Sequence, residues 1–379
     1  MNSASIQGGF SARLWMSRAN GVSRQMQQPS CRQGSQSPEK HGSHTEEAAT
    51  NDAHETSNPP LVTVMIPTFN QARVLPRAIE SALAQDHNNL EVVISDDASP
   101  DETAKVVATY ASDTRVRYHR NEHNLGRVGN YRHTLSRLAK GDYALNLDGD
   151  DWLCDSTFIS QATSLMDHRP DVSLVFGNAW YYQEKNNSFH KPEGYNLNLL
   201  PINDGNELFL KYATEEVWIP HLAAVYRRQL ALDLGFYSLD IIGSDSDAIL
   251  RALLGQKVGF IDNYVAAWRL HEVNATKSLS VSQRLDNLLS VESPYLAARK
   301  KGQIDKRKLD RWRKRMLTRL TNEFVRMAIF NGSYLAAIHF LMTVSLKSPA
   351  VGATVVSDTA NRAVDLFQQR LRRKTRGSK

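Results

Sequence analysis

Three carboxylates, Asp148, Asp150 and Asp151, fall within four positions of the stretch NLDGDDWL. They come directly after the alternating run Tyr143 to Leu147, which predicts a β-strand. Like charges held this close oppose one another's ionisation, so a folded chain needs water or a cation beside them. The spacing Asp148-x-Asp150 suits a hard divalent cation such as Mg²⁺ or Mn²⁺, which keeps positions open for substrate phosphates. An Asp-Gly turn without a metal explains the same residues.

Polar loops also follow earlier runs of apolar, β-branched residues. LVTVMIP leads into PTFN, and LEVVIS leads into Asp96 and Asp97. Helical patterns lie between the strand-like runs, over residues 74–84, 101–110, 128–138 and 156–166. This alternation predicts an α/β fold with a mostly parallel central sheet that is flanked by helices. Because ligands gather at the carboxyl ends of such strands, we expect the polar loops to meet at one edge.

The second half of the chain is less regular. A helix is predicted in GSDSDAILRALLGQ, where Asp245 and Asp247 occupy the first turn and favour the helix dipole. The strand-like segments VGFID and AAWRLH follow. From about Ser282 onward the pattern is helical, so a C-terminal all-helical extension is expected.

Length and composition are typical of a soluble globular protein. The 379 residues, 41% of them hydrophobic, suffice for one large domain and an accessory one. Cys31 and Cys154 are too few for a disulfide framework or a thiolate metal site, which indicates a reducing compartment. The apolar run Tyr334 to Leu346 is shorter than the roughly 20 residues that a membrane span needs, so it predicts a packed helix.

Positive charge is concentrated near the C-terminus. The net charge is +6, and Arg299 to Arg319 contains eleven Lys or Arg residues against Asp305 and Asp310. Such a run is either a solvated helix face or a surface for anionic lipid or nucleic acid. No stacking platform or nucleic-acid motif accompanies the charge, so no nucleic-acid partner is expected.

The N-terminal residues 1–58 are rich in Ser, Gln, His, Asn and Gly, and they predict a disordered tail. Four arginines precede the first acid, Glu39, as in an organellar transit peptide. A misplaced start codon explains the same composition.

The ordered series PTFN, SDDASPDET, NLGRVGNYRHTLSRLAKGDY, LDGDD, GSDSDAILR and WRLH resembles the family 2 glycosyltransferases, which have a GT-A fold. The resemblance covers roughly residues 61–271. It implies a GT-A domain over residues 59–275, with a nucleotide-binding half (59–150) and an acceptor half (151–275). A basic helical region (276–370) and a basic tail (371–379) would complete the chain.

The resemblance assigns roles to particular residues. Those matching the nucleotide-sugar site are Pro67, Thr68, Phe69, Asn70, Asp96, Asp97, Asn124, Gly126, Asn130, Asp148 and Gly149, to which Arg127 is added as a phosphate contact because guanidinium groups bind diphosphate. Metal ligands would be Asp148, Asp150 and His271. Asp245 matches the general base of inverting members. This chain departs from the family's Glu-Asp pair, because Ser244 precedes Asp245.

These roles imply a metal-dependent inverting glycosyltransferase that uses Mn²⁺ or Mg²⁺. It would move one sugar from a UDP- or dTDP-sugar to a hydroxyl of a cell-surface glycan or lipid-linked acceptor. We expect a cytoplasmic protein that rests on the inner face of the cell membrane through its basic helices. Two alternatives remain open: a catalytically silent nucleotide-sugar-binding protein, and a sugar-phosphate nucleotidyltransferase, although PTFNQAR lacks the glycines of the latter's first loop.

Overall fold

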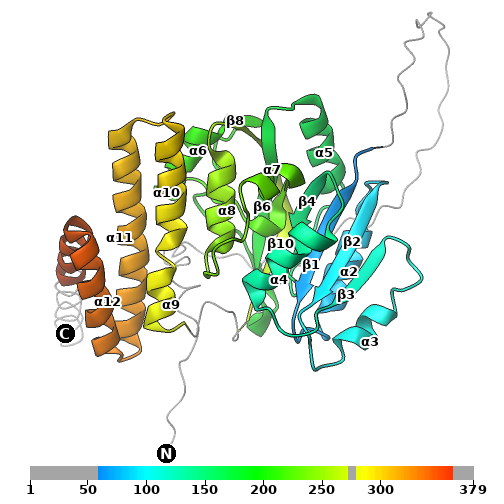
Figure 1. Ribbon diagram of the computed structural model, residues 1–379, viewed down its shortest axis with the longest axis horizontal. Coiled ribbons are helices and arrows are strands. Elements are labelled where there is room, and N and C mark those ends of the chain that lie inside the picture. Colours follow the sequence, from blue (N-terminus) through cyan, green and yellow to red (C-terminus); the bar gives the residue numbers. More distant parts are fainter. Residues whose placement is uncertain (1–58, 272–278, 362–379) are drawn as a thin grey trace, which may run out of the picture.

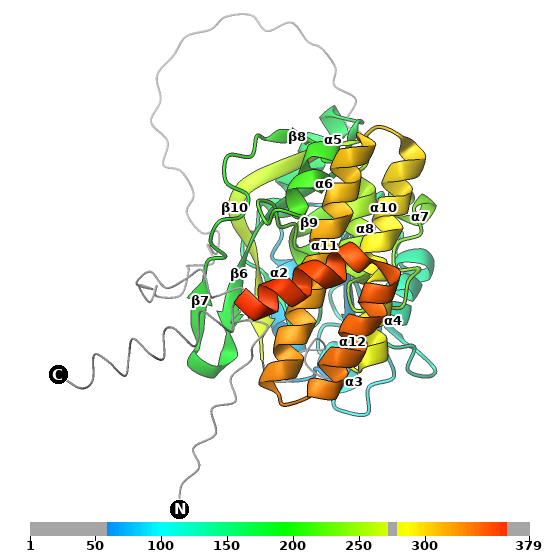
Figure 2. The ribbon, with the colours of Figure 1, turned by 90° about the vertical axis from the view of Figure 1, so that its left-hand side faces the viewer.

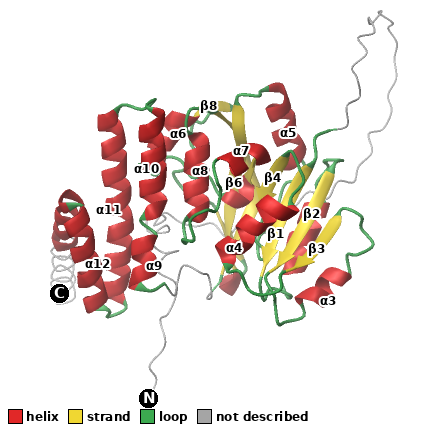
Figure 3. Ribbon diagram, in the orientation of Figure 1, coloured by secondary structure: helices red, strands yellow, loops and turns green. Residues whose placement is uncertain are grey.

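The computed structural model describes residues 59–271 and 279–361. Its strands are β1 (Val62–Thr68), β2 (Leu90–Asp96), β3 (Val116–Arg120), β4 (Tyr143–Asn146), β5 (Trp152–Leu153), β6 (Val172–Gln183), β7 (Ser188–His190), β8 (Ile202–Asp204), β9 (Ala224–Arg227) and β10 (Lys257–Leu270). Its helices are α2 (Leu75–Leu83), α3 (Thr103–Ala108), α4 (Arg127–His133), α5 (Phe158–His168), α6 (Gly205–Tyr212), α7 (Arg228–Asp233), α8 (Ser244–Leu253), α9 (Val281–Asp286), α10 (Leu289–Lys301), α11 (Lys306–Phe330) and α12 (Tyr334–Lys347), and residues 349–361 are also helical. Helices cover both faces of one sheet, and the C-terminal helices extend to one side (Figures 1 and 3).

The strands form a single sheet in the order β3-β2-β1-β4-β9-β6-β10-β5, with β7 paired to β6 and β8 to β10. The pairs from β3 to β4 are parallel, as the alternation of strands and helices predicts. The second half is mixed: β9 is antiparallel to both β4 and β6, whereas β6 and β10 are parallel. The predicted α/β architecture is therefore confirmed. The predicted parallel pairing of strands holds for the first half of the sheet, whereas the second half is mixed.

Each face of the sheet carries its own apolar core. On one face, Val62, Val64 and Ile66 of β1 pack with α2 and α5. On the other, Met65 of the same strand packs with α4, α8 and the C-terminal helices. Successive side chains of a strand point to opposite faces, which explains why every residue of β1 is buried and most are apolar.

The predicted helices are present to within a few residues at each end. Two differences matter for the site. VGFID and AAWRLH belong to one long strand, β10. The helix predicted over residues 128–138 changes at residue 134 from α4 to a π-helical turn, Thr134–Leu138.

The C-terminal extension is helical, as predicted (Figure 2). Its helix α10 packs against α8, α11 packs against α10, and α12 packs against α11. Within the described ranges, no helix combines the length and apolar character that crossing a bilayer requires. The predicted tails at 1–58 and 371–379 lie outside the described residues.

Candidate active site

Parallel pairing brings the predicted polar loops to one edge of the sheet. Thr68 at the end of β1 lies opposite Asp96 at the end of β2, and Met65 lies opposite Asn146 of β4. The loop that follows β4 stays against β1, since the amide of Gly149 donates to the carbonyl of Pro67 at 3.3 Å. The carboxylates after β4 therefore lie beside the PTFN loop.

Gly149 is required by the closeness of that approach. A Cβ at this position would lie 2.9 Å from Thr68 Oγ1 and 2.5 Å from Gln71 Oε1. Any larger residue would thus push Asp148 and Asp150 away from β1. This explains why Gly separates the two acids.

Asp148 lies in a partly buried cluster with Tyr131, His221 and Asp245. Its Oδ1 accepts a hydrogen bond from the Tyr131 hydroxyl at 2.5 Å, and its Oδ2 lies 3.5 Å from His221 Nε2. The other ring nitrogen of His221, Nδ1, is 3.1 Å from Oδ2 of Asp245. His221 thus links a predicted metal ligand to the predicted general base.

Charges in this cluster hold one another in their ionised forms. Burial lowers the pKa of His221, but hydrogen bonds and the charges of Asp148 and Asp245 outweigh it and raise this pKa to about 10. Burial raises the pKa of Asp245, but His221 and Arg127 lower it to about 2. At neutral pH the imidazolium therefore donates to a carboxylate that is free of a proton.

The other predicted metal ligands meet at the end of β10. His271 Nε2 lies 2.9 Å from Asp150 Oδ2. Asp151 is buried below them and accepts a hydrogen bond from the amide of Arg269 at 2.8 Å, which ties the loop after β4 to β10. Burial and the neighbouring charges of Asp150 and Asp148 raise the pKa of Asp151 well above its usual range.

These residues fit a divalent cation that is completed by a substrate. Among the described residues, no group of three Asp, Glu, His or Cys side chains converges as a ready-made metal site. Asp150 and His271 adjoin, whereas Asp148 faces Tyr131 and His221. Mg²⁺ commonly takes only one or two carboxylates and completes its shell with phosphate oxygens and water. The oxygen-rich set and the strong mutual repulsion at Asp151 are consistent with such a cation.

Asp96, predicted to bind the nucleotide base, lies at the carboxyl end of β2 and already has partners. Its side chain is fully buried, with Oδ2 accepting from the Tyr118 hydroxyl at 2.7 Å and Oδ1 from the Ser99 amide at 2.9 Å. A carboxylate has room for further donors. Phe69, directly after β1, and Tyr118, on β3, are both exposed large aromatics.

Asp97 and Asn130 organise the neighbouring loop from inside. Asp97 Oδ1 accepts from Asn121 Nδ2 and from the Leu125 amide, both at 2.8 Å. Buried Asn130 donates to the Ser95 carbonyl at 2.8 Å and accepts from the Ser95 hydroxyl at 2.7 Å. Both side chains are therefore buried and hold the loop before α4 in place.

The remaining loop residues are more exposed. Asn124 accepts from the amide of Gly126, whose positive φ of 77° favours glycine. Asn70 also has a positive φ, and its amide donates to Ser99 Oγ at 2.9 Å. Both positions turn the chain at the rim of the candidate site.

Arg127, predicted to contact phosphate, lies among the cluster's acids. Its guanidinium donates to the Ile242 carbonyl at 2.6 Å and lies near Tyr131 at 3.4 Å. Burial lowers the pKa of Arg127, but Tyr131 and the carboxylates Asp245 and Asp148 raise it overall. Arg127 therefore holds the segment before α8 against α4.

The two acids at the start of α8 face different surroundings. Asp247 is buried and pairs with Arg251, with 2.7 Å between Oδ2 and Nη2, so it is a structural residue. Asp245 points into the cluster. Ser244 is fully buried and its hydroxyl has no hydrogen-bond partner in the described structure.

His221 and Tyr131 received no role from the sequence. His221 lies in the short 3-10 helix His221–Ala223, in an irregular region, and Tyr131 lies within a helical pattern. Asp245, the partner of His221, is 24 positions away, and Asp148, the partner of Tyr131, is 17 positions away. No local sequence pattern could therefore have predicted these two contacts.

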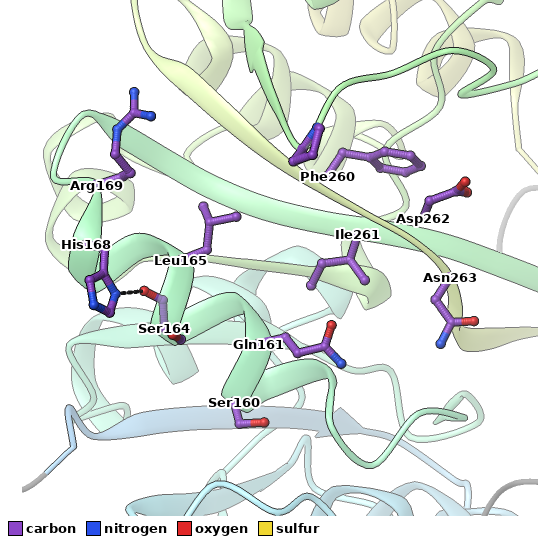
Figure 4. A pocket seen from close by; sticks show the side chains of 11 residues that line it. Ser160, Gln161, Ser164, Leu165, His168, Arg169, Phe260, Ile261, Asp262 and Asn263 are labelled. Atoms are coloured by element: carbon purple, nitrogen blue, oxygen red, sulfur yellow. Dashed lines mark hydrogen bonds between the residues drawn. The ribbon is translucent and has the colours of Figure 1, made fainter. Parts of the chain in front are cut away.

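A separate groove of about 870 Å³ lies between α5 and β10 (Figure 4). Its lining includes Ser164, Leu165, Phe260 and Asn263. None of the predicted site residues contributes to it, so the groove is distinct from the carboxylate cluster.

Replacing Asp96 with alanine is expected to weaken UDP binding about tenfold to a hundredfold, because one charge-assisted hydrogen bond to a base contributes roughly 1.5–3 kcal/mol. Calorimetric titration of UDP measures the effect. Asp113→Ala, at an acid paired with Arg115 far along the same half, serves as the control. Equal UDP affinity for wild type and Asp96→Ala would contradict a base-binding role.

Comparison with known proteins supports the resemblance to family 2 glycosyltransferases. Residues 63–234 match the family model described as Glycosyl transferase family 2. An uncharacterized protein of Mycobacterium tuberculosis is 30% identical over 240 residues, which cover 59% of this chain and 72% of that protein. A GalNAc(5)-diNAcBac-PP-undecaprenol beta-1,3-glucosyltransferase of Campylobacter jejuni is 36% identical over 129 residues, covering 34% of this chain and 40% of that enzyme.

Among solved structures, S. aureus TarS (residues 1–349) in complex with UDP-GlcNAc superposes with a TM-score of 0.56. The match covers 79% of this chain and 80% of that one at 18% sequence identity. At this identity the likeness concerns the fold.

Proposed function

Because the chain belongs to glycosyltransferase family 2 and has the GT-A fold, we propose that it is a metal-dependent, inverting transferase of single sugars. Its donor would be a UDP- or dTDP-sugar. Its acceptor would be a hydroxyl of a cell-surface glycan or of a lipid-linked glycan.

One observation carries the proposal: Asp148, which follows β4, and Asp245, in the first turn of α8, lie in one partly buried cluster bridged by His221. The first set suits a diphosphate with its cation, and the second suits a proton acceptor. A donor bound at the sheet edge would bring its diphosphate to Asp148, and an acceptor hydroxyl would approach Asp245.

In the proposed reaction, the acceptor oxygen attacks the anomeric carbon from the face opposite the diphosphate. A new carbon–oxygen bond forms while the bond to the diphosphate breaks with its electron pair, so the configuration inverts. Asp245 takes the acceptor's proton. With a pKa of about 2, Asp245 is a weak base, so the proton moves late, when the forming bond has made the hydroxyl acidic.

Asp150 and His271, with Asp148, would hold Mn²⁺ or Mg²⁺, which when bound offsets the charge on the leaving diphosphate. Arg127 adds a fixed positive charge beside Asp148 and Asp245. Tyr131 restrains Asp148 through its hydroxyl.

The test is a screen of nucleotide sugars by thermal shift with Mn²⁺ present, followed by transfer assays with the stabilising donor. Proton NMR of the product reports the anomeric configuration. Retention of configuration would refute the inverting mechanism. Tight donor binding without turnover on any acceptor would favour the catalytically silent binding protein, which the departure at Ser244 keeps as the second candidate.

His221 should act by holding Asp245 in position. In His221→Asn the amide nitrogen falls near the place of Nδ1 and still reaches Asp245, whereas in His221→Gln it falls near Nε2 and reaches Asp148 instead. We expect His221→Gln to lower kcat about 100-fold, the effect of a misplaced catalytic group, and His221→Asn to recover most of that loss. Both variants should keep the KM for the donor.

The measurement is steady-state kinetics together with thermal melting. If His221 only supports the fold, both variants would lose kcat in proportion to their loss of melting temperature.

A further inference from the structure

The helix α12 has an apolar face that the fold leaves uncovered. Leu335 and Leu346 are each 84% exposed, and Ile338 and Met342 are more than half exposed. Their spacing of three to four residues places them on one side of the helix. Ala337, Phe340 and Val344, on the other side, are buried and pack in the same core as α11. The prediction of a packed helix thus holds for one face only.

Acidic residues are absent from the sequence around this face. Between Glu323 and Asp358 the chain has no Asp or Glu, and it contains Arg326 and Lys347. On the neighbouring α11, six basic residues are exposed, all within its first ten positions: Lys306, Arg307, Lys308, Arg311, Lys314 and Arg315. Figure 2 shows α11 and α12 on the same side of the molecule. The exposed face of α12 and the basic first turns of α11 therefore belong to one side of the molecule.

A second copy of the chain is a poor partner for such a face. A stable interface buries about 800 Å² on each partner. The 14 residues of α12 make a helix about 21 Å long and about 10 Å wide, which offers only a few hundred Å². A symmetric contact would also bring the cations of both copies together without acids to offset them.

An anionic bilayer fits both properties. Apolar side chains on one face of an interfacial helix enter the boundary between headgroups and acyl chains, and nearby Lys and Arg are attracted to anionic lipid. We propose that α12 is an interfacial anchor, which inserts Leu335, Ile338, Met342 and Leu346 into an anionic membrane while the basic residues of α11 contact headgroups. The sequence predicts a membrane contact for Arg299–Arg319, and the apolar side chains of α12 would add to that contact.

The test is sedimentation of the full chain with vesicles, at one fixed salt concentration. One set contains only phosphatidylcholine and the other about one third phosphatidylglycerol. We expect binding to the anionic vesicles alone, and a loss of at least about tenfold in Leu335→Ser/Leu346→Ser. The matched control is Leu197→Ser/Leu200→Ser, which removes two leucines that are 68% and 65% exposed elsewhere, and it should bind like the wild type.

Equal binding by the two double variants, or no binding by the wild type, would overturn the proposal. So would light scattering that shows a wild-type dimer and a monomeric Leu335→Ser/Leu346→Ser, because the face would then be a self-association surface. The assay needs neither donor nor turnover, so its outcome is independent of the proposed reaction.

Discussion

Asp245→Asn is expected to lower kcat by about 1000-fold or more while the donor still binds, because general-base catalysis contributes roughly two to four decades in rate. Asparagine keeps the shape of the side chain, and its carbonyl oxygen still accepts from His221 Nδ1, which lies 3.1 Å from Asp245 in the native protein. What the variant loses is the ability to take a proton. The rate of sugar transfer and the calorimetric affinity for UDP together measure the effect.

Asp262→Asn makes a suitable control, since Asp262 is exposed on β10 beside the separate groove. Its kinetics should match those of the wild type. If Asp245→Asn lost donor binding as well as turnover, Asp245 would be a structural residue of the cluster. Undiminished turnover would remove it from the mechanism.

Asp150→Ala is expected to reduce transfer by about 100-fold to 10,000-fold, and EDTA should do the same to the wild type. Neutralising the charge on a leaving diphosphate is worth several kcal/mol, and each 1.4 kcal/mol is about tenfold in rate. The alanine variant leaves His271 without its carboxylate partner, which lies 2.9 Å away in the native protein. Transfer assays with and without EDTA, followed by an excess of Mn²⁺, measure the dependence.

Added Mn²⁺ should restore the wild type after EDTA and leave Asp150→Ala impaired. Asp171→Ala, at an exposed acid paired with Arg169, is the control and should respond to EDTA as the wild type does. Full activity of Asp150→Ala, or of the wild type in EDTA, would refute the metal role of this loop.

Much of the first half of the fold follows from local sequence patterns. The apolar runs that become β1 and β2 are buried on both faces, and the helical periods between them show that their connections cross over. Crossover connections make the strands parallel, and parallel strands end at a common edge. The sequence pattern alone therefore places Asp96 and Asp148 at one site.

The second half is less predictable because its pairings are not local. β9 inserts between β4 and β6 in antiparallel fashion, although about 80 residues separate it from β4. VGFID and AAWRLH each appear as short strands, and only the pairing with β6 shows that they form one element.

The sequence by itself determined the kinds of residue at the sheet edge and their order, because period and turn chemistry are short-range properties. Only the tertiary structure decided how each side chain is used. It joined His221 to Asp148 and Asp245, buried Asp97 and Asn130 in internal hydrogen bonds, and left one face of α12 uncovered. These outcomes depend on contacts between distant segments, and such contacts follow from how helices pack on the completed sheet.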